Sequence, residues 1–149
     1  MAAIIKFTPL LGAVSEQVPP HRTKGRNGVT LTTPYASLLE IDDFTILLDC
    51  GWNDSLDPSI LTQLIETAPT VDAILISHPD IYHCGALPAI LPHLSGPEVK
   101  VYSSSPCVRF GHLALDDLRM SKEQEEEKFT AFEKDVVDSV FEKRYDKDL

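Results

Sequence analysis

Four consecutive apolar residues at positions 73–76, Ala-Ile-Leu-Ile, constrain the fold of this 149-residue chain more than any other feature. Short apolar runs without alternation are typical of strands buried on both faces, although a buried helical segment gives the same pattern. Stretches of helical periodicity lie on both sides of the run, one after Asp57-Pro58 and one after Gly85. Alternating strands and helices predict an α/β layered architecture, in which ligands gather at the carboxyl ends of strands.

The other predicted strands are short and rich in β-branched or aromatic residues. They cover residues 4–8, which we expect Pro9 to end, 35–41, 44–49 and 99–103. Asp42-Asp43 separates two of them and predicts a tight hairpin. Residues 12–33 are polar and rich in Pro, Gly and basic side chains, which is typical of a long loop or an insertion.

Three of the predicted helices have recognisable starts or ends. The first begins with Asp57 as N-cap and proline at the next position, and Pro69 ends it. The second covers residues 85–94, with Pro88 in its first turn. The third begins at Ser105-Pro106, extends to about residue 127 and carries the apolar residues Val108, Leu113 and Leu118.

A last helix is predicted from an apolar stripe at helical spacing. The stripe consists of Phe132, Val136, Val137, Val140 and Phe141. Thr130 and Glu133 have the spacing of a capping box at its start. Because charged residues fill the other face, we interpret the stripe as packed on the core.

The charge balance limits the classes of function. The chain has 13 basic and 23 acidic residues and a net charge of −10. Phosphate binding relies on clustered Lys and Arg, so the overall balance argues against a strong nucleic-acid clamp. Residues 21–26, His-Arg-Thr-Lys-Gly-Arg, are the exception, and we interpret this basic loop as a solvated surface segment. An RNA contact or a localisation signal is the alternative.

The cysteine pattern and the apolar runs indicate a soluble intracellular chain. Cys50, Cys84 and Cys107 are far apart and odd in number, which predicts reduced thiols and no disulfide framework. We interpret Cys50 and Cys84 as buried packing residues. The first residues lack a basic segment followed by a long apolar core, so they do not resemble a signal peptide. No apolar run approaches the ~20 residues that span a bilayer.

The residues after the apolar run, "ISHPDIYHCGALP" at positions 76–88, contain candidate metal ligands. In an extended loop, His78 and Asp80 point to the same side, and His83 could reach back to them. Imidazole and carboxylate groups both bind zinc, so a partial zinc site is one interpretation. The alternative is structural: the histidines bind the backbone, and Asp80 caps the helix that follows.

Together with "ILLDCGWN" at positions 46–53, this motif resembles the metallo-β-lactamase superfamily of the β-CASP type. Active members carry His-x-His-x-Asp-His, followed by Cys-Gly-Ala-Leu-Pro in similar members. His78 matches the first histidine and His83 the last. Asp80 stands at the position of the second histidine, and Tyr82 stands at the position of the aspartate. The intact "CGALP" fixes this alignment.

The resemblance implies that the two changed positions matter for chemistry. Active members use two zinc ions to bind the phosphate and the attacking hydroxide. A phenol keeps its proton at neutral pH and is a poor zinc ligand, so Tyr82 cannot replace the aspartate. We therefore expect no dinuclear centre, no catalytic residue and no bound cofactor, with zinc as an open alternative. The family also implies that Asp49 supports the motif loop by hydrogen bonds.

The downstream metal ligands of the family have no counterpart in this chain. His93 and His112 lie on predicted helices without the matching context, and we interpret them as structural or surface residues. The resemblance extends over nearly the whole chain, with residues 15–33 as an insertion in a partial domain at 1–149. It implies an αββα sandwich of which only the amino-terminal part is present. The apolar sheet faces of such a part would be uncovered, and we expect poor solubility.

Within this group the chain is similar to the non-catalytic β-CASP subunits of the cleavage and polyadenylation specificity factor. The resemblance implies a nuclear pseudo-nuclease that pairs with the catalytic β-CASP endonuclease subunit and a symplekin-like scaffold. Pre-mRNA would be contacted through the complex, and no membrane would be involved. Two alternatives are a metal-dependent RNA hydrolase with a mononuclear zinc site at His78, Asp80 and His83, and direct RNA recognition by the basic loop.

Overall fold

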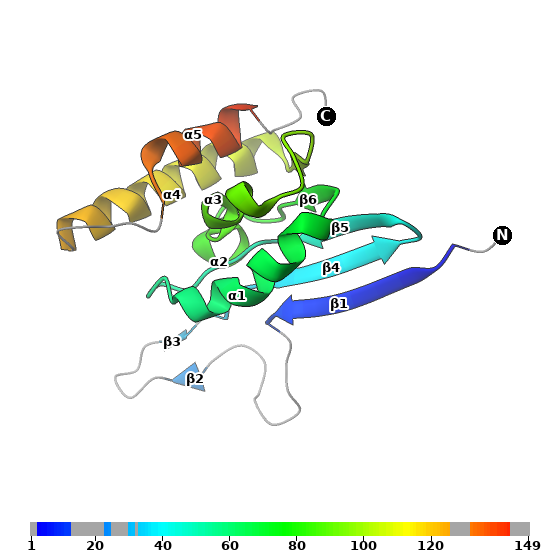
Figure 1. Ribbon diagram of the computed structural model, residues 1–149. Helices are drawn as coiled ribbons and strands as arrows, with labels where there is room; N and C mark the ends of the chain where they lie inside the picture. Colours follow the sequence, from blue (N-terminus) through cyan, green and yellow to red (C-terminus); the bar gives the residue numbers. More distant parts are fainter. Residues whose placement is uncertain (1–2, 13–22, 25–29, 32, 126–131, 144–149) are drawn as a thin grey trace.

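A mixed five-stranded sheet forms the centre of the computed structural model, which describes residues 3–12, 23–24, 30–31, 33–125 and 132–143 (Figure 1). The strands are β1 (Ile5–Leu11), β4 (Ala36–Ile41), β5 (Phe44–Leu48), β6 (Ala73–Leu75) and β7 (Lys100–Tyr102), in the order β1-β4-β5-β6-β7. Strands β1, β4 and β5 are antiparallel neighbours, whereas β5, β6 and β7 run parallel. The predicted α/β class is confirmed.

Strand β1 continues beyond the end that Pro9 was expected to impose. Pro9 pairs with Ser37, and the register shifts between Pro9 and Leu11. The prediction was wrong because β1 lies at the edge of the sheet, where a proline that lacks a backbone N–H is tolerated, especially at a bulge.

The predicted hairpin between β4 and β5 is confirmed. Asp42 has a φ of 52°, a left-handed conformation that Asp tolerates better than most residues. Its backbone N–H donates to the carbonyl of Ile4 at 2.9 Å, and its Oδ1 accepts from the Ile4 N–H at 2.8 Å. The turn therefore also fixes the start of β1.

Most of the predicted insertion at residues 15–33 lies outside the described residues. The part that is described includes β2 (Thr23–Lys24) and β3 (Thr30–Leu31), which pair antiparallel as a separate two-stranded sheet. Of the basic loop at 21–26, only residues 23–24 are described, so its predicted role stays a prediction.

Helix α1 (Pro58–Thr67) follows the predicted capping pattern. The Asp57 side chain accepts a hydrogen bond from the Ser59 N–H at 2.9 Å, and a 3₁₀ turn (Ala68–Thr70) continues the helix past Pro69. Hydrogen bonding to Ser59 lowers the pKa of Asp57. Leu61, Leu64 and Ala68 of the predicted apolar face are buried.

The single helix predicted for residues 85–94 is divided into shorter pieces and starts earlier. The structure has α2 (Ile81–Cys84), α3 (Leu87–Ile90) and a 3₁₀ turn (Leu91–His93). Asp80 caps α2, as the structural interpretation of this residue predicted. Gly85 and Ala86 separate α2 from α3, and Pro88 occupies the first turn of α3.

Helices α4 (Ser105–Glu125) and α5 (Lys134–Lys143) form a pair. In α4, Leu115 is fully buried, whereas Leu113 is 62% exposed. The apolar stripe of α5 packs on the core as predicted, but Thr130 of the capping box lies outside the described residues. Among the helices in the described ranges, none combines the length and the apolar character that crossing a membrane requires.

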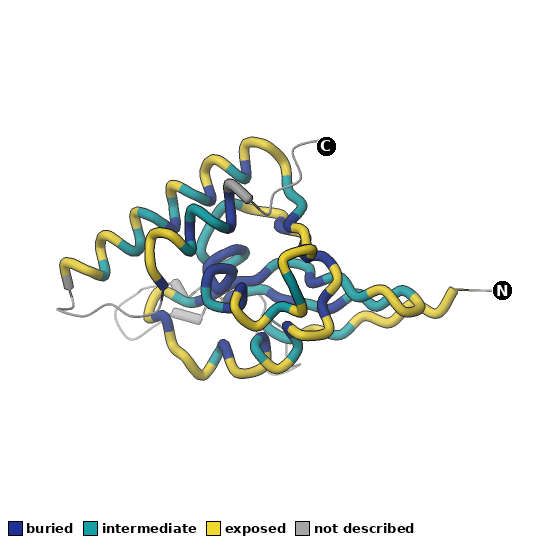
Figure 2. Tube along the Cα trace, turned by 45° about the horizontal axis from the view of Figure 1, so that its top comes forward, coloured by how far each residue is buried: buried dark blue, intermediate teal, exposed yellow. Residues whose placement is uncertain are grey.

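The helices cover one face of the sheet. Both parallel connections, through α1 and through α2–α3, step across the sheet in the same direction, and right-handed crossovers place them on the same face. Leu47, Ile74 and Val101 are neighbours on β5, β6 and β7, and all three are at most 1% exposed beneath the helices. Figure 2 shows the buried residues where helices and sheet meet, and exposed residues along the sheet end near the N-terminus.

Candidate functional site

The motif lies at the carboxyl edge of the parallel strands. Asp49 follows β5, Ser77 follows β6 and Ser103 follows β7, so the three loops leave the sheet side by side. The Ile76 N–H donates to the Tyr102 carbonyl at 2.9 Å, and Ser103 Oγ donates to the Ile76 carbonyl at 2.7 Å. The expectation that the motif lies where ligands gather in α/β folds is confirmed as a location.

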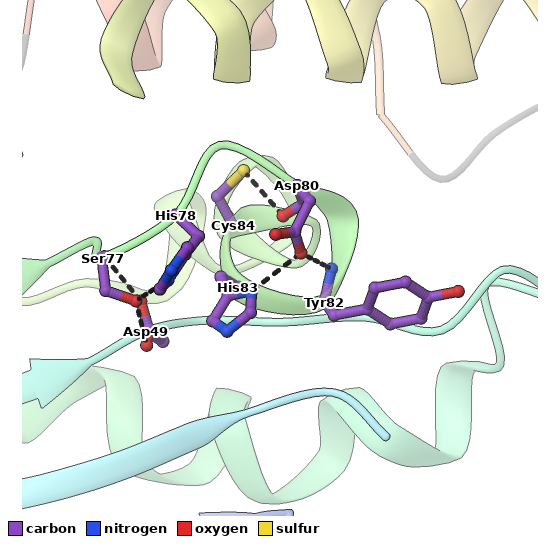
Figure 3. A network of polar contacts seen from close by, with 7 residues as sticks. All are labelled: Asp49, Ser77, His78, Asp80, Tyr82, His83 and Cys84. Atoms are coloured by element: carbon purple, nitrogen blue, oxygen red, sulfur yellow. Dashed lines mark hydrogen bonds and ion pairs between the residues drawn. The ribbon is translucent and has the colours of Figure 1, made fainter. Parts of the chain in front are cut away.

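Asp49 anchors the start of the motif loop. Its φ of 57° turns the chain out of β5, and its carboxylate accepts from Ser77 through the backbone N–H at 2.8 Å and through Oγ at 2.8–2.9 Å (Figure 3). An ionised carboxylate only accepts, so the single hydroxyl hydrogen of Ser77 points to Asp49. The supporting role expected for Asp49 is therefore visible as three contacts with one residue.

This arrangement fixes the tautomer of His78. Its Nδ1 lies 2.8 Å from Ser77 Oγ, whose hydrogen is already directed to Asp49. His78 Nδ1 must therefore donate its own hydrogen to that oxygen. In the neutral ring, the lone pair that could bind a metal is then on Nε2, and the side chain is exposed.

Asp80 pairs with His83 and caps α2 with the same oxygen. His83 Nδ1 lies 2.8 Å from Asp80 Oδ1, and the Tyr82 N–H donates to Oδ1 at 3.0 Å. Because the carboxylate accepts, His83 also carries its hydrogen on Nδ1. A carboxylate in this position orients the imidazole and does not compete for the metal-binding nitrogen. Asp80 therefore contacts the Nδ1 side of the His83 ring and orients this imidazole, which is a different role from binding a metal.

Three aromatic rings are in contact along the site, with one stacked and one tilted pair. Tyr35 and His83 have ring centroids 5.1 Å apart at an interplanar angle of 17°, and His78 and His83 have centroids 4.5 Å apart at 38°. The two histidines are thus brought together as the motif predicted. Tyr35 was not predicted to be a site residue. The only sequence signal for it is that it is an aromatic residue immediately before β4.

The side chain of Tyr82 points away from both histidines (Figure 3). Its hydroxyl donates to Asp54 Oδ2 at 2.7 Å, in the loop between β5 and α1. The phenol oxygen of Tyr82 is therefore not directed toward the two imidazoles. The sequence analysis did not identify Asp54, because no motif marks this aspartate in its loop.

The backbone of the motif is bound to the loop after β5. Cys50 N–H donates to the His83 carbonyl at 2.6 Å, and Trp52 N–H donates to the Ile81 carbonyl at 2.8 Å. Between them, Gly51 lies so close to Tyr82 that any Cβ would overlap the Tyr82 carbonyl group. The glycine of "LLDCGW" is therefore required by this close approach.

The three cysteines are buried, as was predicted for Cys50 and Cys84. Burial raises the pKa values of the Cys50, Cys84 and Cys107 thiols, and nearby charges add to the effect for Cys50 and Cys84. Cys84 Sγ donates to the Asp80 carbonyl at 3.2 Å. A protonated thiol is a poor nucleophile and metal ligand, so these cysteines act as packing residues.

The residues of the motif do not fit the dinuclear zinc centre of the active relatives. Asp80 directs a carboxylate oxygen to His83 Nδ1 and to the helix cap, and the Tyr82 hydroxyl is bound to Asp54. What remains is a pair of imidazole nitrogens, one fewer than the three protein ligands of a typical catalytic zinc site. Within the described ranges, no group of three or more His, Cys, Asp or Glu residues is placed to hold a metal ion.

Outside the motif, the two histidines among the described residues, His93 and His112, have the structural or surface positions that the sequence predicted. His93 is exposed at the end of the turn after α3. His112 Nε2 lies 2.8 Å from Asp138 Oδ1, and its ring contacts Phe141 edge-on at 5.5 Å between centroids. His112 therefore links α4 to α5 and has a structural role that does not involve the motif.

Comparisons with known proteins agree with the architecture. Residues 38–146 match the family model described as a metallo-beta-lactamase superfamily domain. The chain is 40% identical over 141 residues to cleavage and polyadenylation specificity factor subunit 2 of Oryza sativa subsp. japonica, and 38% identical over 141 residues to that of Arabidopsis thaliana. These alignments cover 95% of this chain but only 17% of each relative. The solved structure of human tRNase Z, short form, aligns with a TM-score of 0.45 and 20% identity over 80% of this chain and 40% of that chain.

Proposed function

The chain belongs to the metallo-β-lactamase superfamily, and from this premise we propose that it serves as a non-catalytic scaffold subunit in pre-mRNA 3′-end cleavage and polyadenylation. The relatives with 36–40% identity over about 95% of the chain are named as subunit 2 of the cleavage and polyadenylation specificity factor. The chain spans 16–17% of their length, so the role of the whole protein is part of the proposal.

The predicted metallo-β-lactamase fold is confirmed by the family match. The single sheet with helices on one face corresponds to one sheet-and-helix half of the αββα sandwich that the sequence predicted. The second half of that sandwich has no counterpart in the described residues.

One observation carries the proposal that the motif is non-catalytic. At the two positions where the motif departs from the active pattern, Asp80 uses Oδ1 to cap α2 and to orient His83, and the hydroxyl of Tyr82 is bonded to Asp54. A pseudo-nuclease of this kind would act by pairing with a catalytic β-CASP endonuclease subunit and a symplekin-like scaffold in the nucleus. Its contact with pre-mRNA would be made through the assembled complex.

The test is cleavage by the assembled complex with the full-length protein carrying His78→Ala and His83→Ala. Both changes remove the only imidazole nitrogens of the described motif, and we expect the rate of pre-mRNA cleavage to be unchanged. The control is the matching pair of histidine substitutions in the catalytic subunit, which should abolish cleavage. A rate that falls by a factor of ten or more in the chain's own variant, with complex assembly intact, would establish a metal-dependent hydrolase instead.

A further inference from the structure

Main-chain hydrogen bonds already fix the position of the motif before any side chain is considered. Residues 81–86 exchange three of them with the loop after β5: Cys50 N–H to the His83 carbonyl, Trp52 N–H to the Ile81 carbonyl, and Ala86 N–H to the Cys50 carbonyl at 2.9 Å. The Tyr35 N–H adds a fourth, to the Tyr82 carbonyl at 2.8 Å. These bonds need no particular side chain, so the loops stay in register whatever the motif binds.

Side chains add a second set of links between the same segments. The Asp49 carboxylate joins the end of β5 to Ser77, and the Asp80 carboxylate joins the start of α2 to His83. Each carboxylate accepts at least two hydrogen bonds, and hydrogen bonds to an ionised acceptor are stronger than those between neutral groups.

Tyr82 supplies the link on the far side of α2. Its hydroxyl donates to Asp54 at 2.7 Å, which ties α2 to the β5–α1 loop, and its backbone carbonyl accepts from the Tyr35 N–H, which ties α2 to the segment before β4. The carboxylate of Asp54 is exposed, which makes this link weaker than a buried one. The Tyr82–Asp54 hydrogen bond adds a contact on the side of the motif opposite the histidines.

We propose that these contacts form a metal-independent lock that orders the carboxyl edge of the sheet. The lock consists of Asp49, Asp54, Ser77, Asp80, Tyr82 and His83. In it, Asp80 and Tyr82 are positioning residues, because they hold other groups in place and touch no substrate. The inference goes beyond the proposed function, since it concerns what keeps this edge folded and not what the assembled protein does.

The first test is the thermal unfolding midpoint of the 149-residue chain, with EDTA and with added zinc chloride. A metal bound only by the folded chain, at one hundred times its Kd, would raise the midpoint by about 5–10 °C in a domain of this size. The lock predicts the same midpoint, within replicate error, in EDTA and in zinc. A midpoint that falls in EDTA and is restored by zinc would overturn it. This measurement needs no variant, so it stands even if a substitution prevents folding.

The second test compares one variant with a matched control. Asp80→Ala removes the α2 cap and the His83 partner, and should lower the midpoint by about 2–4 °C equally in EDTA and in zinc. Asp117→Ala, at an exposed position of α4, should leave it nearly unchanged. Equal midpoints for Asp80→Ala and Asp117→Ala would overturn the proposal.

The link between Tyr82 and Asp54 is tested by a double-mutant cycle. Tyr82→Phe and Asp54→Ala should each lower the midpoint, and the double variant should lose no more than the larger single loss, because both remove the same bond. Tyr102→Phe, on β7, is the control for the loss of a hydroxyl. Additive losses would show that the bond is not part of the lock. The lock can fail here while the cleavage assay still shows a dispensable motif, so the two proposals fail separately.

Discussion

A single missing methyl group at Gly51 allows the loop after β5 to touch α2. A Cβ at this position would overlap backbone atoms of Tyr82, which cannot move without breaking the bonds on either side. We therefore expect Gly51→Ala to lower the free energy of unfolding by at least about 2 kcal/mol, as overpacking against backbone does. Urea denaturation followed by circular dichroism measures this change.

Gly96 provides a matched control for that substitution. The three atoms nearest to a Cβ at Gly96 would all belong to the carboxylate end of Glu98, which is the far end of a flexible side chain. Gly96→Ala should therefore stay within about 0.5 kcal/mol of the original chain. If the two glycine variants have the same stability, the close approach of Gly51 to Tyr82 is wrong.

The contact between Asp138 and His112 predicts a dependence of stability on pH. The hydrogen bond from His112, with smaller effects of Lys134 and Arg119, lowers the pKa of Asp138 in the folded chain. A carboxylate with a lower pKa in the folded state binds fewer protons there than in the unfolded state. Its contribution to stability is therefore present above its unfolded pKa of about 3.9 and is lost as the pH falls through its folded pKa.

The variant Asp138→Asn isolates this contribution. The free energy of unfolding, measured from pH 6 down to pH 2.5, should fall less steeply in the variant than in the original chain. The gap between the two curves should be constant at pH 6–5 and should close below pH 4. Parallel curves over the whole range would contradict the assigned pKa direction.

At the scale of elements, apolar burial holds α5 in place more than the exposed polar contact does. Val137 and Val140 are fully buried, whereas the side chains of His112 and Asp138 are about one third exposed. Val140→Ala should destabilise the chain by about 2–3 kcal/mol, from two lost methyl groups and the cavity they leave. Ser139→Ala, one residue earlier on the same helix, should change stability by less than about 0.5 kcal/mol, and thermal unfolding of both variants gives the comparison.

Elements with local signals were predictable from the sequence, and those set by neighbours were not. The Asp57-Pro58 start of α1 and the apolar stripe of α5 are local patterns, and both are found as expected. The continuation of β1 past Pro9 depends on its place at the edge of the sheet, which one strand alone does not reveal. The early start of α2 at Ile81 depends on bonds to residues 50–52.

In the candidate site, too, some features were predictable from the sequence and others were not. The pairing of His78 with His83 and the cap at Asp80 follow from a short motif. The partners Tyr35 and Asp54 come from other segments and carry no motif, so only the folded chain identifies them. A sequence can indicate which groups are present, but the atom that each carboxylate oxygen contacts depends on the tertiary structure.

At the scale of the whole molecule, the described helices cover one face of the sheet, and no described element covers the other. Ile5, Ile41 and Phe44 are cross-strand neighbours and point to the face opposite the helices. The exposed fractions are 66% for Ile5, 58% for Phe7, 50% for Phe44 and 47% for Leu75, all on this face. The sequence predicted uncovered apolar sheet faces and poor solubility, and a contiguous patch of this kind favours association in water.

Replacing Phe7 and Phe44 by Thr tests the link between that face and solubility. Thr keeps the preference for strands but removes the exposed aromatic surface, so we expect a higher soluble concentration, weaker binding of the dye ANS and a nearly unchanged unfolding midpoint. The control is Phe141→Thr, because Phe141 is only 6% exposed in the core. The same chemical change there should lower the midpoint steeply, since burying an aromatic ring contributes several kcal/mol. Equal ANS binding and equal soluble concentration of the Phe7→Thr, Phe44→Thr variant and the original chain would contradict this prediction. The dye would then bind a different surface, and this face of the sheet would not limit solubility.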